Sequence, residues 1–250
     1  LASDFPWNLL GVIILTSLGT WGLPQMVHKF YAIKDEKSIN TGTVISTLFA
    51  IVIAGGSYFL GGFGRLFDGP AIHNAQGGIV YDSIIPTMLS TLPDILIGVV
   101  VVLVLSASMS TLSSLVLTSS STLTLDFLRG TVMKDMSEKT QLLLIRLLII
   151  FFIALSVVLA LDPPTFIAQL MGISWGALAG AFLAPFFYGL YWKRVTAASV
   201  WSCFGFAIIL TVSNIFLKFI PSSIVAGAIA MVAGLVIVPV VSLLTRKPDA

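Results

Sequence analysis

The stretch that decides the fold reads ILIGVVVVLVL at residues 95–105 and continues as SASMSTLSSLVLTSSSTLT at residues 106–124. Twelve of the nineteen residues in the second part are Ser or Thr, whereas the first part has no polar side chain. Polar groups are costly at membrane depth unless something binds them. Five positions recur at helical spacing and share one face: Ala107, Ser110, Thr111, Ser114 and Thr118. Because oxygen donors without a nearby carboxylate suit a hard, weakly held monovalent cation, this face predicts an ion site inside a transporter.

The composition is that of an integral membrane protein. Of the 250 residues, 57% are hydrophobic and only 10% are charged, whereas charged residues make up about 25% of a soluble domain. The mean hydropathy of +1.05 agrees. The single cysteine, Cys203, excludes an internal disulfide framework. Since the chain starts at Leu1 without a methionine, we expect a piece of a longer protein that begins midway through a membrane domain.

Seven apolar segments are long enough to cross a hydrocarbon core, which takes about 20 helical residues. They cover residues 7–32, 42–62, 95–118, 142–161, 166–191, 197–217 and 224–244. Each helix would satisfy its own backbone hydrogen bonds, as a lipid environment requires. The fold class predicted is therefore an all-α polytopic membrane protein with seven transmembrane helices.

The basic residues predict the orientation of these spans. Eleven of the thirteen fall on one side: Lys29, Lys34, Lys37, Arg129, Lys134, Lys139, Arg146, Lys193, Arg194, Arg246 and Lys247. Only Arg65 and Lys218 fall on the other side. The positive-inside rule then places the N-terminus outside and the C-terminus in the cytoplasm, with the chain in the plasma membrane. On the outer side, the long segment 67–94 predicts a partly helical lid, and a plain connector is the alternative.

The first span contains a second chemical signal. Its middle reads SLGTWGLPQM at residues 17–26, with Gly19, Gly22 and Pro24 close together. Proline removes a backbone donor and glycine loosens a helix, so we expect a broken helix of the kind that presents backbone groups to substrate in secondary transporters. Trp21 and Gln25 flank the break and offer an aromatic face and an amide. A simple proline kink is the alternative interpretation.

Three stretches together resemble the sodium:solute symporter family. They read GTWGLPQMVHKFYAIKDEKS at 19–38, PTMLSTLPD at 86–94 and SASMSTLSSLVLTSSSTLTLDFLRG at 106–130. The resemblance implies a LeuT-type fold of two inverted five-helix repeats. Residues 1–191 would be the second repeat, with the broken first helix, the outer lid at 67–94 and the sodium-site helix at 95–118. Residues 192–250 would be two accessory helices and a short cytoplasmic tail, and the N-terminal repeat would be missing.

The resemblance also implies a sodium site and a transported solute. The backbone carbonyl of Ala107 and the hydroxyls of Ser110 and Thr111 match the family's sodium ligands. Some members bind a second sodium ion, and the matching hydroxyls are Ser110, Ser113 and Ser114, with a carboxylate partner expected in the missing repeat. Trp21, Gly22 and Gln25 are the candidates on the substrate side. The implied function is Na⁺-coupled import of a small organic solute, such as proline, pantothenate or a monocarboxylate, by alternating access.

Other interpretations stay open at this point. Ser and Thr in membrane helices often bond back to the carbonyl four residues earlier or bridge helices. For the hydroxyls of residues 118–124 we expect either this or exposure at the cytoplasmic end near Asp126. A hydroxyl-lined channel or a proton-coupled carrier is the alternative function. An enzyme is not expected, because no His, Asp, Glu or Lys lies within the spans away from their ends. Beyond the solute, the bilayer and the missing repeat, no partner is expected, and no nucleic acid.

Overall fold

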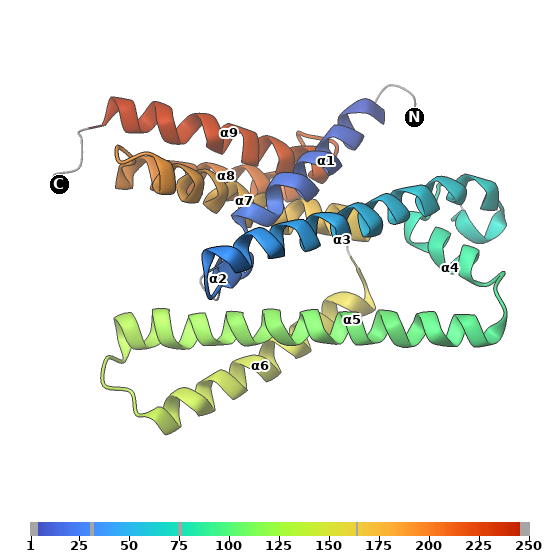
Figure 1. Cartoon of the computed structure of the whole chain (residues 1–250), viewed down its shortest axis with the longest axis horizontal. Helices are drawn as coiled ribbons and strands as arrows, with labels where there is room; N and C mark the ends of the chain where they lie inside the picture. The colour runs from blue at the N-terminus through green and yellow to red at the C-terminus, as the bar shows by residue number, and fades with distance from the viewer. Residues whose placement is uncertain (1–4, 31–32, 75–76, 164, 246–250) are drawn as a thin grey trace. The chain divides into compact units, whose positions relative to one another are not determined.

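The computed structural model describes residues 5–30, 33–74, 77–163 and 165–245 (Figure 1). These residues are almost entirely helical. The chain divides into two compact units, one made of residues 1–42 and 165–250 and the other of residues 43–164. We describe each unit by itself.

Five helices build the first unit. They are α1 (Phe5–Gly22), α2 (Pro24–Phe30), α7 (Ile167–Tyr191), α8 (Ala197–Leu217) and α9 (Ser223–Leu244). Helices α7, α8 and α9 pack against one another, and α1 lies against both α7 and α9 (Figure 1). The first unit is therefore a tight helical bundle.

Glycine makes the closest helix contact in this bundle possible. A Cβ atom added to Gly227 of α9 would overlap the carbonyl oxygen of Gly172 in α7. One added to Gly176 would lie 2.5 Å from the Cα of Gly227. Small residues let two backbones approach closely where lipid offers no hydrophobic driving force between helices. The packing of α7 on α9 thus depends on backbone contact at these three glycines.

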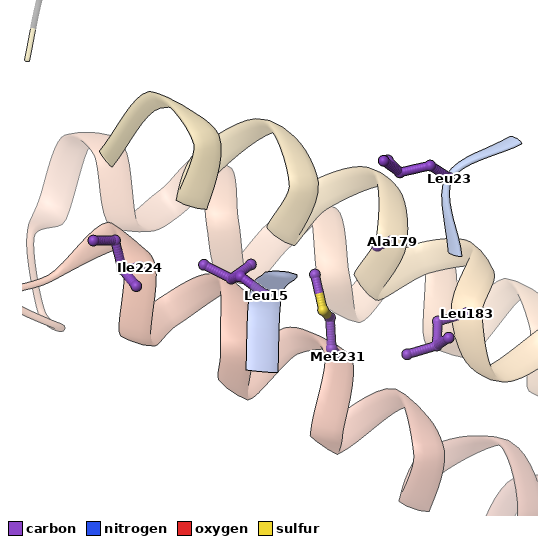
Figure 2. Packing of buried hydrophobic residues seen from close by; sticks show 6 residues of the cluster. All are labelled: Leu15, Leu23, Ala179, Leu183, Ile224 and Met231. Carbon is purple, nitrogen blue, oxygen red and sulfur yellow. The ribbon is translucent and has the colours of Figure 1, made fainter. Parts of the chain in front are cut away.

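Larger side chains fill the space where α1 meets α7 and α9. The buried cluster consists of Leu15, Leu23, Ala179, Leu183, Ile224 and Met231 (Figure 2). Leu15 and Met231 are fully buried, and Leu23 is the residue between α1 and α2. The interruption of the first predicted span is therefore anchored in the core of the unit.

The second unit has much less internal packing. It contains most of α3 (Glu36–Phe63), α4 (Ile84–Leu89), α5 (Asp94–Ser121) and α6 (Glu138–Leu161). Neither α3 nor α6 has a buried residue. Helix α5 continues without a gap as the π-helix η4 (Thr122–Val132), and α6 packs against both. Most of the apolar surface of this unit is exposed.

The predicted spans correspond well to these helices. Six helices of the described residues are long and apolar enough to cross a membrane, and they match the six spans predicted from residue 42 onward. The first predicted span is divided at Leu23 into α1 and α2, which confirms the interruption. The third extends beyond residue 118, because η4 carries it to Val132.

The segment 67–94 is partly helical, as predicted. Helix η1 (Gly64–Phe67) leads into it, and the short helices η2 (Pro70–Ile72) and η3 (Tyr81–Ser83) precede α4. His73 pairs with Ile79 in an isolated antiparallel bridge. Gly77 has a φ of +78°, which suits the turn between these two residues because glycine has no side chain to clash there. The partly helical character is thus confirmed, and the role of the segment as a lid stays a prediction.

Candidate functional site

Helix α5 presents the predicted cation ligands along one exposed face. It begins after Pro93, and Asp94 in its first turn complements the positive end of the helix dipole. The side chains of Ala107, Ser110 and Thr111 are all exposed, as are those of Ser113 and Ser114. The helix is regular through Ser121, so the three- and four-residue spacing keeps these groups on neighbouring positions of its surface.

The hydroxyls of this face differ in their hydrogen bonds. Ser113 Oγ donates to the carbonyl oxygen of Met109 at 2.7 Å, and Thr118 Oγ1 donates to that of Ser114 at 2.8 Å. Within the described part of the chain, the hydroxyls of Ser110 and Thr111 form no hydrogen bond. These two hydroxyls therefore keep both their proton and their lone pairs available for a ligand.

A shallow hollow of about 450 Å³ lies over the same part of α5. Its lining residues are Ala107, Ser108, Thr111, Leu112 and Leu115. Two of the three predicted sodium ligands, Ala107 and Thr111, are among them. One helix supplies all five residues, so a cation held here would need further ligands from another element.

The expected back-bonding of residues 118–124 is only partly confirmed. Thr118 bonds to Ser114, and Ser121 Oγ bonds to the carbonyl oxygens of Leu117 (2.8 Å) and Thr118 (3.0 Å). For Ser120 and Thr124 the prediction is wrong, because both hydroxyl oxygens are buried without a hydrogen-bond partner. The π-helix accounts for Thr124, which lies in η4. Backbone hydrogen bonds there span five residues, as in Met133 N to Leu128 O at 2.7 Å, so the carbonyl four residues earlier no longer has its α-helical position.

The interruption of the first span has a clear local cause. Pro24 has no backbone N–H, so the carbonyl of Thr20 loses its helical donor. The helix restarts at once, because Met26 N and Val27 N donate to the carbonyl oxygen of Leu23 at 2.9 and 3.2 Å. Gly22 is required by packing as well, since a Cβ there would lie 2.8 Å from the Cβ of Leu183.

The candidates on the substrate side surround this interruption. The side chain of Trp21 is 56% exposed, and that of Gln25 is half-buried. In the described residues, the Gln25 amide makes no hydrogen bond. Gly22 is buried against α7, so of the three candidates only Trp21 and Gln25 offer a side chain to a solute. They belong to the first unit and the hydroxyls of α5 to the second.

Sequence reasoning missed two polar contacts in the first unit. Tyr188 of α7 donates its hydroxyl to the carbonyl oxygen of Leu235 at 2.9 Å. That carbonyl lies four residues before Pro239 and therefore lacks its helical donor. A group of hydroxyls also joins the start of α8 to the end of α9, where Ser242 Oγ donates to Ser199 Oγ at 2.8 Å. Pro239 was the available signal for the first contact, but it does not tell which distant residue supplies the donor.

Comparison with known proteins decides the family. The family model for the sodium:solute symporter family matches residues 4–205, which is most of the chain. The chain belongs to the sodium:solute symporter family. This confirms the resemblance inferred from the three stretches at 19–38, 86–94 and 106–130.

Similar members of this family are bacterial transporters. The sodium/pantothenate symporter of Haemophilus influenzae is 32% identical over 88% of this chain and 46% of the relative. The osmoregulated proline transporter OpuE of Bacillus subtilis is 29% identical over 92% of this chain and 47% of the relative. The sodium/proline symporter of Haemophilus influenzae is 29% identical over 74% of this chain and 38% of the relative. The chain thus spans about half the length of such relatives or less, and no solved structure matches it significantly.

Proposed function

We propose that this chain forms part of a symporter that couples the inward movement of Na⁺ to the import of a small organic solute. The observation that carries the proposal is the pair of unbonded, exposed hydroxyls of Ser110 and Thr111 on α5, in a chain of the sodium:solute symporter family. Relatives are named for pantothenate and proline, which are small and carry a carboxylate. A solute of that class is therefore the first to test.

The first sodium site would use three oxygens of α5. They are the carbonyl of Ala107 and the hydroxyls of Ser110 and Thr111. Since one helix face supplies only part of a coordination sphere, the remaining ligands would come from the N-terminal repeat that we infer for the longer protein. Residues 1–191 would then be the second repeat of a LeuT-type fold and residues 192–250 two accessory helices.

A second sodium ion is compatible with the hydrogen bonds of α5. Its ligands in this chain would be Ser110, Ser113 and Ser114. Ser113 donates its proton to the carbonyl of Met109, and this leaves the lone pairs of its oxygen free for a cation. The carboxylate that would balance the second charge belongs to the inferred repeat.

The energy for import would come from the sodium gradient. One positive charge moving inward through a membrane potential of 100 mV, negative inside, releases about 2.3 kcal/mol. Binding of Na⁺ by Ser110 and Thr111 would stabilise the outward-open state, and the solute would bind beside Trp21 and Gln25. Movement of one repeat against the other would then open both sites to the cytoplasm.

Proton coupling is the less favoured alternative. A proton-coupled carrier needs a titratable group near the coupling site, and residues 95–118 of α5 contain no Asp, Glu, His or Lys. The hydroxyls of serine and threonine do not titrate in the physiological range. The α5 face therefore suits a metal cation better than a proton.

The deciding experiment measures solute uptake against Na⁺ concentration for the intact protein in proteoliposomes, with radiolabelled proline and pantothenate. Ser110→Ala and Thr111→Ala should each raise the half-saturating Na⁺ concentration about tenfold or more, because each removes a charge-ligating oxygen. Thr111→Ser keeps the hydroxyl and should stay near wild type.

Ser119→Ala is the matched control. Ser119 is also exposed on α5, but nine residues from Ser110 it points to the opposite side of the helix. Unchanged Na⁺ dependence in both Ser110→Ala and Thr111→Ala would contradict the sodium site. Uptake that follows a pH gradient with no need for Na⁺ would establish the proton-coupled alternative instead.

A further inference from the structure

The loop between α7 and α8 carries two adjacent basic residues, Lys193 and Arg194, at one end of the first unit. We propose that these two residues bind the phosphate of an anionic phospholipid at the membrane–water interface. The proposal concerns a lipid site and does not depend on the sodium site of α5 or on the transported solute. Four observations from the first unit support it.

The guanidinium of Arg194 is mostly without acceptors. Its Nη2 donates to the carbonyl oxygen of Leu243 at the end of α9, at a distance of 3.4 Å. Its Nε is buried and has no hydrogen-bond partner among the described residues. A guanidinium has five N–H donors in a planar fork that matches the oxygens of a phosphate. The contact with Leu243 therefore positions the group, and the remaining N–H donors of Nη1 and Nη2 stay available for an anion.

In the described residues, no carboxylate forms an ion pair with Lys193 or Arg194. Residues 163–247 contain no Asp or Glu at all. Among the described residues, the only ion pair joins His73 to Asp68 in the other unit. An anion that neutralises Lys193 and Arg194 must therefore come from outside the α7–α9 bundle.

Aromatic residues mark the depth of the site. Helix α7 has 25 residues and so is about 38 Å long, which exceeds the hydrocarbon thickness of about 30 Å. Its last turn carries Tyr188 and Tyr191, and Trp192 follows directly; the rings of Tyr188 and Trp192 lie 6.1 Å apart. Tyr and Trp collect at the level of the lipid headgroups. Lys193 and Arg194 come next in the chain and thus reach the level of the phosphates.

Hydrogen bonds hold the loop in place. Thr196 Oγ1 lies 2.7 Å from Thr245 Oγ1, and the amide of Thr196 donates to Ser242 Oγ at 3.4 Å. Ser242 in turn bonds to Ser199, and both side chains are fully buried. The end of α9 and the start of α8 are therefore tied together beside the two charges. A site ordered before binding loses less entropy when the ligand arrives.

The test is native mass spectrometry of the purified intact protein with added phosphatidylglycerol, and with phosphatidylcholine as the uncharged comparison. Wild type should retain phosphatidylglycerol in preference. Arg194→Gln and Lys193→Gln should each lower that retention about fivefold, as expected for one basic group near an anionic surface. Arg194→Lys keeps the charge but loses the planar fork of donors, so its retention of phosphatidylglycerol should lie between that of wild type and that of Arg194→Gln.

The control variant is Lys218→Gln, which removes a basic residue at the opposite end of α8. Equal retention in wild type and in the double variant of Lys193 and Arg194 would overturn the proposal, as would an equal loss in Lys218→Gln. Displacement of the lipid by millimolar inorganic phosphate would identify a site for free anions and likewise overturn it. If Arg194→Gln does not fold, Lys193→Gln decides alone, because the Lys193 side chain is exposed and forms no hydrogen bond or ion pair with the described residues.

Discussion

Helices α9 and α5 are both strongly apolar, yet α9 is largely packed within its unit and α5 is mostly exposed. In the 18-residue apolar stretch that marks α9 as a membrane span, 44% is buried, whereas nothing is buried in the corresponding stretch of α5 and η4. The buried residues of α9 include Ala226, Gly227 and Gly234, which let it approach α7 closely, whereas Val116 and Ser120 are the buried residues of α5. Hydropathy therefore indicates that a helix enters the membrane, but it does not indicate which helices pack on one another within this chain.

The largest effect should come from breaking the glycine contact of α9. Gly227→Ala places a methyl group onto the carbonyl oxygen of Gly172, and backbone atoms cannot move aside as a side chain can. We expect a loss of about 3 kcal/mol in the free energy of unfolding, at the upper end for overpacking. Unfolding of the purified protein in detergent, followed by tryptophan fluorescence, measures it.

Two control substitutions sharpen this comparison. Gly205→Ala in α8 meets no atom within 4 Å and should leave stability unchanged or slightly raised. Gly55→Ala in α3 also meets none. A large loss at Gly205 would contradict the packing argument, and a large loss at Gly55 would mean that another part of the intact protein covers α3.

An effect of intermediate size is expected in α9, where the Tyr188 hydroxyl replaces the backbone donor that Pro239 lacks. Tyr188→Phe removes the donor to the Leu235 carbonyl and leaves that partly buried oxygen without its partner, at a cost of about 1 kcal/mol. Pro239→Ala restores the backbone donor, so Tyr188→Phe should cost much less in that background. A double-mutant cycle on thermal unfolding measures the coupling. Additive effects of the two substitutions would show that the Tyr188 hydroxyl does not replace the missing backbone donor.

The second unit should respond in the opposite direction to loss of a buried hydroxyl. Thr124→Val replaces the unpartnered Oγ1 with a methyl group of similar shape, so it should be neutral or stabilise by up to about 1 kcal/mol. Thr118→Val is the comparison, because Thr118 has its bond to Ser114 and should lose a few tenths of a kcal/mol. Destabilisation of more than 1 kcal/mol by Thr124→Val would show that the hydroxyl has a partner in the intact protein.

The smallest expected effect concerns the start of α3. Ser38 donates hydrogen bonds to the carboxylate of Asp35, including its backbone amide at 2.7 Å, and these bonds lower the pKa of Asp35. Because the pKa of Asp35 is lowered in the folded state, its hydrogen bonds with Ser38 are complete above the ordinary pKa of about 3.9. They are lost as the pH falls through the pKa of the folded state. Hydrogen exchange of the Ser38 amide, corrected for its intrinsic rate, should therefore speed up only below that range. Asp35→Asn should abolish this pH dependence.

Local features of the sequence were sufficient to predict the interruption at Leu23 and the back-bonding of Thr118. In the first case Gly22 and Pro24 act on their own backbone, and in the second the acceptor is four residues away. Ser110 and Thr111 were predicted as sodium ligands in a similar way, from spacing on one helix and from the family resemblance, and this role stays a prediction.

Contacts between distant residues could not be predicted in this way. The donor for the Leu235 carbonyl lies 47 residues away at Tyr188, and hydropathy does not indicate which helix faces α9. The five-residue bonding of η4 shifts the register after Ser121, so the burial of Thr124 does not follow from a regular helix of 3.6 residues per turn. These features depend on which helices pack together.

The acid-free stretch from residue 163 to 247 has a consequence for proton sensitivity. It contains no histidine either, since the two histidines of the chain are His28 and His73. Histidine is the only side chain with an ordinary pKa between 5 and 8. The α7–α9 bundle therefore contributes no side chain whose charge ordinarily changes between pH 5 and pH 8, so any pH dependence of the proposed transport in this range would originate in groups outside the bundle.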